Sequence, residues 1–170
     1  MSSNSEVRWL DPRERAAWVR LAAVVELLPG VLESQLRRDA DLSHFEYWVL
    51  SMLSEAPSHT LRMTALATRT NATLPRLSHV VQRLGGRGLV GRFPCPEDRR
   101  ATNVRLTDEG WTKVVDAAPG HLMAVRHNVV DALTPDQLGQ LAGIADAILE
   151  RIDPGAAAEA WNRETSQSDG

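Results

Sequence analysis

The chain has 170 residues, 43% of them apolar, a formal net charge of −3 and a single cysteine. A chain of this length corresponds to one folded unit, or to one unit with an extension. One cysteine excludes an internal disulfide and is typical of the reducing cytoplasm, and no apolar run is long enough for a membrane-spanning helix. The N-terminal residues also lack the apolar segment of a signal peptide, so we expect a cytoplasmic protein without a membrane partner.

The first helix is expected over about residues 12–38, after loosely ordered polar residues 1–10. Asp11 and the proline after it are typical of a helix start, since the carboxylate caps the first turn and proline suits the first helical position. Apolar residues recur at helical spacing through this stretch, and Pro29 within it predicts a kink. Trp18 lies on the apolar stripe and is interpreted as a core residue, with ligand lining as the alternative.

Two short helices are expected next. Ser43 and Glu46 have the spacing of a capping box, in which each residue satisfies a free amide of the other, so a helix should begin here and run to about residue 55. A turn at 56–59 and a helix over 63–70 follow, and Asn71 and its neighbour make a tight turn. Helix, short turn and further helix is the order of a helix-turn-helix unit.

A basic helix follows this turn. Thr73 is its expected N-cap, and the glycines at 85, 86 and 88 are expected to end it. Leu77 and the apolar residues at 80, 81 and 84 form one stripe, so the opposite side of the helix should face solvent. That side carries Pro75, Arg76, His79, Gln82 and Arg83.

Residues 89–93 and 102–106 predict a two-stranded ribbon, because both stretches are short, alternating and rich in strand-forming residues. The charged loop between them has Arg99 and Arg100 near its tip. A basic helix fits the major groove of DNA, and arginines on an extended tip can enter the narrower and more negative minor groove. Helix and ribbon together therefore predict a DNA-binding unit with a wing.

The charge distribution supports this prediction. Residues 61–105 contain nine arginines, no lysine and only two acids, Glu97 and Asp98, although the whole chain is acidic. Such asymmetry favours one segment that faces a polyanion. The alternative is an ordinary solvated surface.

A long helix is expected from Thr107 to about residue 133, with a second kink at Pro119. Thr134 and Gln137 form another capping box and begin a last helix. Its apolar residues recur at the spacing of a coiled-coil seam, which favours pairing with a second copy of the chain over pairing within the chain. The seam residues are Leu138, Leu141, Ala145, Ile148 and Ile152.

Motifs for other functions are weak. Residues 86–91 match the spacing of a dinucleotide-binding glycine loop, but a helix precedes them and a strand follows, which is the reverse of the order that motif needs. The histidines lack metal-ligand spacing, and no catalytic constellation assembles. We therefore expect neither an enzyme nor a bound metal or cofactor.

Several stretches resemble the multiple antibiotic resistance regulator (MarR) family of bacterial winged-helix transcription factors. The matching stretches are 42–53, 66–92, 96–110 and 133–149, and the resemblance covers roughly residues 12–152. Its most specific part is the wing signature, which consists of Asp98, Arg100, Leu106, Thr107 and Gly110.

The resemblance implies a mainly α fold with a small β-hairpin wing. It places a winged helix-turn-helix domain at 41–107 between dimerisation helices at 11–40 and 108–153, followed by a largely disordered tail over 154–170. Two copies would interlock through these helices and grip a pseudo-palindromic operator on double-stranded DNA.

The resemblance also implies roles for individual residues. Arg100 matches the wing arginine that enters the minor groove, Asp98 the acid that holds it, and Arg99 a phosphate contact. His79 departs from the long polar or basic residue usual at its position, since an imidazole makes a shorter and pH-dependent contact. The wing residues and those of the basic helix together give the expected DNA-binding residues. They are Thr73, Leu74, Pro75, Arg76, Ser78, His79, Arg83, Arg92, Asp98, Arg99 and Arg100.

The usual logic of the family is repression that a small aromatic or lipophilic ligand relieves. A crevice for such a ligand would lie near Trp18, His44, Tyr47 and Trp48, whose alternative role is ordinary packing. Two other hypotheses stay open. The chain could be a winged-helix module that binds protein, or a regulator that senses oxidants through Cys95, whose pKa the nearby Arg92, Arg99 and Arg100 would lower.

Overall fold

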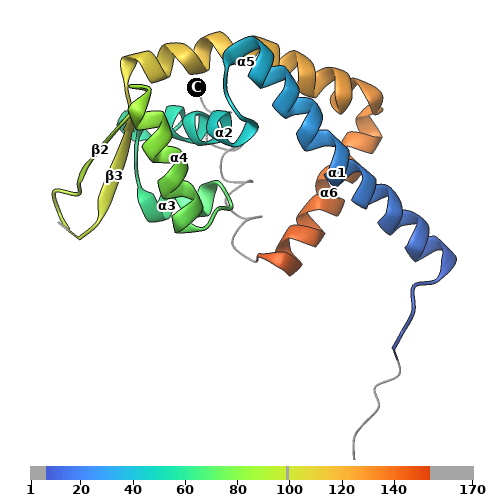
Figure 1. Ribbon diagram of the computed structural model, residues 1–170. Helices are drawn as coiled ribbons and strands as arrows, with labels where there is room; N and C mark the ends of the chain where they lie inside the picture. Colours follow the sequence, from blue (N-terminus) through green and yellow to red (C-terminus); the bar gives the residue numbers. More distant parts are fainter. Residues whose placement is uncertain (1–6, 99, 154–170) are drawn as a thin grey trace, which may run out of the picture.

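The computed structural model describes residues 7–98 and 100–153, and Figure 1 shows how the elements of this part follow one another. The expected tail over 154–170 and Arg99 lie outside the described residues. The helices are α1 (Pro12–Ala40), α2 (His44–Ser54), α3 (Met63–Arg69), α4 (Leu74–Gly86), α5 (Asp108–Asn128) and α6 (Pro135–Ile152), with short 3₁₀ turns η1 (Pro57–His59) and η2 (Val130–Ala132). The strands are β1 (Thr60–Arg62), β2 (Val90–Pro94) and β3 (Thr102–Leu106).

Local capping signals determine where the helices begin. Asp11 accepts hydrogen bonds from the first-turn amides of α1, and complete capping boxes start α2 at Ser43 and α6 at Thr134. Thr107 caps α5 by accepting from the Gly110 amide at 3.0 Å. These starts confirm the sequence predictions, because each depends on residues within a single turn.

Both expected kink sites lie inside uninterrupted helices. α1 runs through Pro29, and α5 runs through Pro119 but ends at Asn128 instead of near residue 133. The two prolines are exposed, so the carbonyl groups that lose an amide partner lie on the solvent side. The chain after α5 forms the turn η2, which corrects the expected length of that helix.

The core lies between α2, α3, α4 and the sheet. Leucine is its commonest residue, and the leucines with no exposed surface include Leu50, Leu53, Leu66, Leu77 and Leu84. Trp18 is not part of it: 58% of its surface is exposed, which corrects the core interpretation. Its stripe on the first half of α1 has no covering element in the described chain, and only the later residues Leu32 and Leu36 are buried.

The wing sheet has three strands in the order β1-β3-β2, all antiparallel. The ribbon of β2 and β3 was predicted, and its register pairs Val90 with Leu106 and Pro94 with Thr102. β1 was not predicted, because three residues are too short to show alternation and only their pairing with β3, Thr60 opposite Arg105, makes them a strand.

The helix α4 also ends differently from the prediction. Gly85 and Gly86 belong to the helix, and only Gly88 adopts a positive φ, of 73°. Glycine adopts this left-handed conformation without steric cost, so Gly88 alone turns the chain from α4 into β2.

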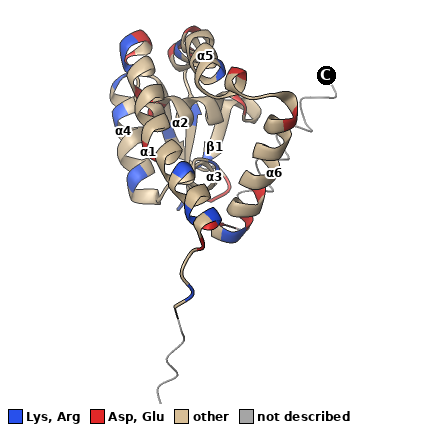
Figure 2. Ribbon diagram, turned by 90° about the vertical axis from the view of Figure 1, so that its right-hand side faces the viewer, with Lys and Arg blue, Asp and Glu red and all other residues tan. Residues whose placement is uncertain are grey.

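One side of the molecule is apolar and uncovered. No residue of α6 is buried, and Leu141, Ile144, Ile148 and Ile152 are all exposed. Figure 2 turns this side toward the viewer and shows mostly uncharged positions along α6 and along the middle of α1. In residues 21–32 of α1, Glu26 is the sole charged residue.

Candidate nucleic-acid interface

The exposed side of α4 carries the residues that the sequence placed there. Thr73 caps the helix by accepting from the Arg76 amide at 3.4 Å. Leu74 is 47% exposed at the first turn, and Ser78 is half-buried. Pro75, Arg76, His79, Gln82 and Arg83 are exposed, as the helical spacing predicted.

Arg76 rests on an aromatic ring. Its guanidinium carbon lies 4.1 Å from the centroid of the Phe45 ring, which comes from the first turn of α2. A cation over the face of an aromatic ring is attracted by the ring's electrons, so the side chain of Arg76 is partly ordered before any ligand arrives. The contact joins two helices that share no local pattern, so the sequence alone does not indicate it.

Arg83 differs from its neighbours because an acid inside the protein already holds it. Glu46 accepts from the Nε and Nη2 atoms of Arg83 at 3.2 and 3.0 Å. Burial opposes ionisation of Glu46, but the Ser43 amide and the Arg83 guanidinium outweigh it, so the pKa of Glu46 is lowered. Arg83 therefore lies on the predicted face of α4 but is not free there.

The wing places Arg92 and Arg100 at exposed positions. Asp98 accepts from the backbone amide of Arg100 at 3.0 Å, so it fixes the turn that presents the arginine rather than its guanidinium. Arg62 of β1 ties the loop to the sheet through an ion pair with Glu97 at 3.1 Å. Sequence reasoning missed Arg62, since it became part of the wing only through the unpredicted strand.

Cys95 lies in the wing loop and is buried, with 3% of its surface exposed. The Glu97 amide lowers the pKa of its thiol; burial acts in the opposite direction, and the Asp98 amide and the Arg62 guanidinium add to the lowering. The lowered pKa agrees with the prediction, but its causes are two amides and Arg62 rather than Arg92 or Arg100.

Three of the four residues expected at a ligand crevice are linked by ring contacts to His121 of α5, two of them directly and Trp48 through His44. His121 of α5 lies with its ring centroid 4.5 Å from that of Tyr47 and 5.9 Å from that of His44, and His44 is 6.4 Å from Trp48. Burial lowers the pKa of His44 and of His121; Glu33 opposes it at His44, whereas His44 reinforces it at His121. Burial also raises the pKa of Tyr47.

Two buried polar atoms close to this cluster lack a hydrogen-bond partner among the described residues. They are Oε1 of Gln35 on α1 and Nδ1 of His121. Gln35 lies against the chain neighbour of His121, because a Cβ on Gly120 would lie 3.1 Å from Nε2 of Gln35. Buried polar atoms usually find a partner, so this place between α1 and α5 could accept one from a ligand.

The geometry defines a class of protein: a winged helix-turn-helix unit whose second helix and wing present exposed arginines, joined to long helices with an uncovered apolar side. A sequence model of the MarR family matches residues 42–102. In the part of the chain that the structure describes, no helix has the length and apolar character needed to cross a membrane.

The chain is similar in sequence and structure to known transcriptional regulators. Sco3205 of Streptomyces coelicolor, a MarR family transcriptional regulator crystallised with DNA, is 42% identical with a TM-score of 0.85, covering 89% of this chain and 94% of that one. AbsC of the same organism, also a MarR family transcriptional regulator, is 35% identical with a TM-score of 0.83, covering 86% and 98%. The HTH-type transcriptional repressor YetL of Bacillus subtilis (strain 168) is 33% identical over 93 residues, which are 53% of this chain and span 56% of YetL.

The chain belongs to the MarR family of transcriptional regulators. The expected fold, mainly α with a small winged sheet, is confirmed apart from the extra strand. Members of this family are regulators and not enzymes, so the expectation that the chain is not an enzyme is confirmed as well.

Proposed function

We propose that the protein is a homodimeric repressor that binds a pseudo-palindromic operator on double-stranded DNA. The observation that carries the proposal is the placement of arginines: the exposed side of α4 and the wing of β2 and β3 stand side by side in Figure 1 and both carry them. α4 would lie in the major groove and Arg100 in the minor groove. The crystallisation of Sco3205 with DNA supports the proposal, and binding to the bacterial chromosome would place the protein in the cytoplasm.

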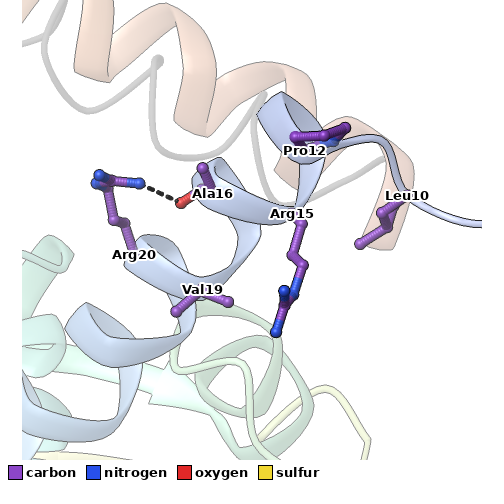
Figure 3. Close-up of a pocket in the computed structure, with 6 residues that line it drawn as sticks. All are labelled: Leu10, Pro12, Arg15, Ala16, Val19 and Arg20. Atoms are coloured by element: carbon purple, nitrogen blue, oxygen red, sulfur yellow. Dashed lines mark hydrogen bonds between the residues drawn. The ribbon is translucent and has the colours of Figure 1, made fainter.

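The second copy is proposed from the apolar side of the molecule. Exposed apolar residues on α1, α5 and α6 exceed the scattered ones that a monomer tolerates. Figure 3 shows a hollow at the start of α1, where Leu10, Pro12 and Val19 lie beside Arg15, and Arg20 donates to the Ala16 carbonyl at 2.9 Å. A partner's helix would cover such a surface, and it would set the two winged units about one turn of DNA apart.

The release signal is proposed to be a small aromatic or lipophilic molecule. His44, Tyr47 and Trp48 form an aromatic cluster with His121, and the unpaired atom of Gln35 lies close by. Trp18 lies on the exposed half of α1, so it would contact a ligand only if the ligand extended to the interface between the two copies. A ligand here would touch α1, α2 and α5 together, so it could change the angle between the winged unit and the dimer helices.

Arginine substitutions test the DNA proposal. Arg76→Ala should weaken operator binding by about 1–3 kcal/mol and blunt sequence preference, because it removes a side chain that reaches a base edge. Arg100→Ala should weaken binding through the loss of the minor-groove contact. Fluorescence anisotropy with DNA from upstream of the protein's own gene, over a series of salt concentrations, measures both effects.

Arg126→Ala is the matched control for these variants. It removes an exposed arginine at the far end of α5 from the wing, and we expect wild-type affinity. If the wild-type protein binds no duplex even at low salt, the alternative function gains support, in which the winged unit binds a protein instead of DNA. The exposed arginines on α4 and the wing argue against that alternative.

One observation favours oxidant sensing as an addition to this function: two backbone amides and Arg62 surround the Cys95 thiol and lower its pKa. A thiolate can take one oxygen atom from a hydroperoxide to give a sulfenic acid while water or an alcohol leaves. Operator binding by Cys95→Ser, with and without peroxide, tests the idea. Equal loss of binding in wild type and variant would exclude Cys95 as the sensor.

A further inference from the structure

Arg83 belongs to the exposed side of α4, yet its side chain already has a partner within the chain. Its Nε and Nη2 atoms both donate to Oε1 of Glu46, at 3.2 and 3.0 Å. The side chain of Glu46 is 4% exposed and that of Arg83 is 49% exposed, so the pair lies at the edge of the core. Two donors on one carboxylate oxygen fix the orientation of a guanidinium as well as its position.

Glu46 is held from its other side too. Its Oε2 atom accepts from the Ser43 amide at 2.7 Å, which closes the capping box of α2. Arg87 places Nη1 4.0 Å from the same oxygen and Nη2 3.4 Å from Asp41, the residue that ends α1. One buried carboxylate therefore joins the first turn of α2 to the C-terminal part of α4, and Arg87 extends the connection to α1.

We propose that the ion pair of Glu46 and Arg83 is a clamp that positions α4 on DNA. Arg83 then serves the clamp instead of binding a phosphate. Apolar packing of Leu77, Val81 and Leu84 holds α4 on the core, and the clamp adds a directional contact near its C-terminal end. Base-contacting side chains tolerate little displacement, so a looser helix should lose sequence discrimination first. The inference rests on the proposed DNA-binding function and revises the role predicted for Arg83.

Glu46→Gln tests the clamp. Glutamine can still accept from the Ser43 amide, so the capping box and the fold of α2 should survive, but the charge that holds Arg83 is gone. A freed Arg83 should neutralise a phosphate, so the plot of log affinity against log salt becomes steeper by about one on random duplex DNA. The ratio of operator to random-DNA affinity should fall about tenfold, a typical size for coupling between sites.

Glu33→Gln is the matched control. Glu33 accepts from the His44 amide at 2.6 Å and from Nε of Arg37 at 2.9 Å, so it also joins the start of α2 to an arginine, but none of its hydrogen bonds reaches α4. The same loss of one negative charge should here leave the salt slope and the affinity ratio at wild-type values.

Arg83→Gln provides a second test that does not depend on Glu46→Gln folding. The clamp predicts an unchanged salt slope with a lowered affinity ratio, whereas a phosphate contact predicts a slope shallower by about one. The shallower slope, or a wild-type affinity ratio in Glu46→Gln, overturns the inference while leaving operator binding established. If wild type binds no duplex, the proposed function fails and the inference fails with it.

Discussion

Gly110 is the position where the wing leaves no space for a side chain. A Cβ built there would lie 2.0 Å from the Leu89 carbonyl oxygen and 2.7 Å from Cδ1 of Leu106. The surrounding backbone cannot move easily, because Thr107 accepts from the Gly110 amide at 3.0 Å and donates to the Gly88 carbonyl at 2.6 Å. The close approach of α5 to the start of β2 thus gives a physical reason for a glycine at this point of the wing signature.

Gly110→Ala should destabilise the fold by about 3 kcal/mol, because a methyl group must displace backbone rather than a flexible side chain. Urea unfolding followed by circular dichroism measures the change. Gly143→Ala is the control, since a Cβ there meets nothing within 4 Å and alanine favours the interior of α6. Similar stabilities of the two variants would contradict the packing argument.

Groups that can titrate take part in the contact between α2 and α5. His44 and Tyr47 of α2 meet His121 of α5, and burial lowers the pKa of both histidines. Each is therefore neutral in the fold at a pH where the unfolded chain, with a histidine pKa of about 6.5, already takes up protons. The stabilisation is fully present above that pH and is lost as the pH falls toward the folded values.

We expect the unfolding temperature to fall as the pH is lowered from neutral toward the acidic side of histidine titration, and to fall less in His121→Phe. Phenylalanine keeps an aromatic ring against Tyr47 but cannot bind a proton. Calorimetry over this pH range measures both slopes. The control is His127→Phe, which removes an exposed histidine from the last turn of the same helix and should leave the wild-type slope. Parallel slopes for wild type and His121→Phe would exclude this histidine as a cause.

Interactions within one helical turn were predictable from the sequence, and those between distant elements were not. The capping box of Ser43 and Glu46 needs only their spacing, so α2 was placed correctly. The bond from Glu46 to Arg83 joins residues 37 positions apart, and no pattern along the chain indicates it. Likewise β1 exists only through its pairing with β3, and the stripe that contains Trp18 showed an apolar face without showing what covers it.

The distribution of charge over the molecule explains how an acidic protein can bind a polyanion. The chain has a net charge of −3, but nine of its arginines fall within residues 61–105, which form the strands, α3 and α4. Twenty of the 22 acids lie outside that segment, as do the exposed apolar residues of α1, α5 and α6. Steering toward DNA depends on the local potential and not on the net charge. The N- and C-terminal helices can therefore form the contact between two copies while residues 61–105 bind DNA.

If α6 forms the interface between two copies, a charge on its seam should separate them. Leu141→Glu places a carboxylate on the exposed apolar line of Leu141 and Ile148, and burying it unpaired against a partner should cost about 3 kcal/mol or more, a hundredfold or more in the dimer dissociation constant. Ala147→Glu introduces the same charge away from that line and should leave the dimer intact. Sedimentation equilibrium measures association, and operator binding should fall together with it, because a single winged unit contacts only half of the site. A monomeric wild type, or a Leu141→Glu variant as dimeric as the control, would remove α6 from the proposed interface.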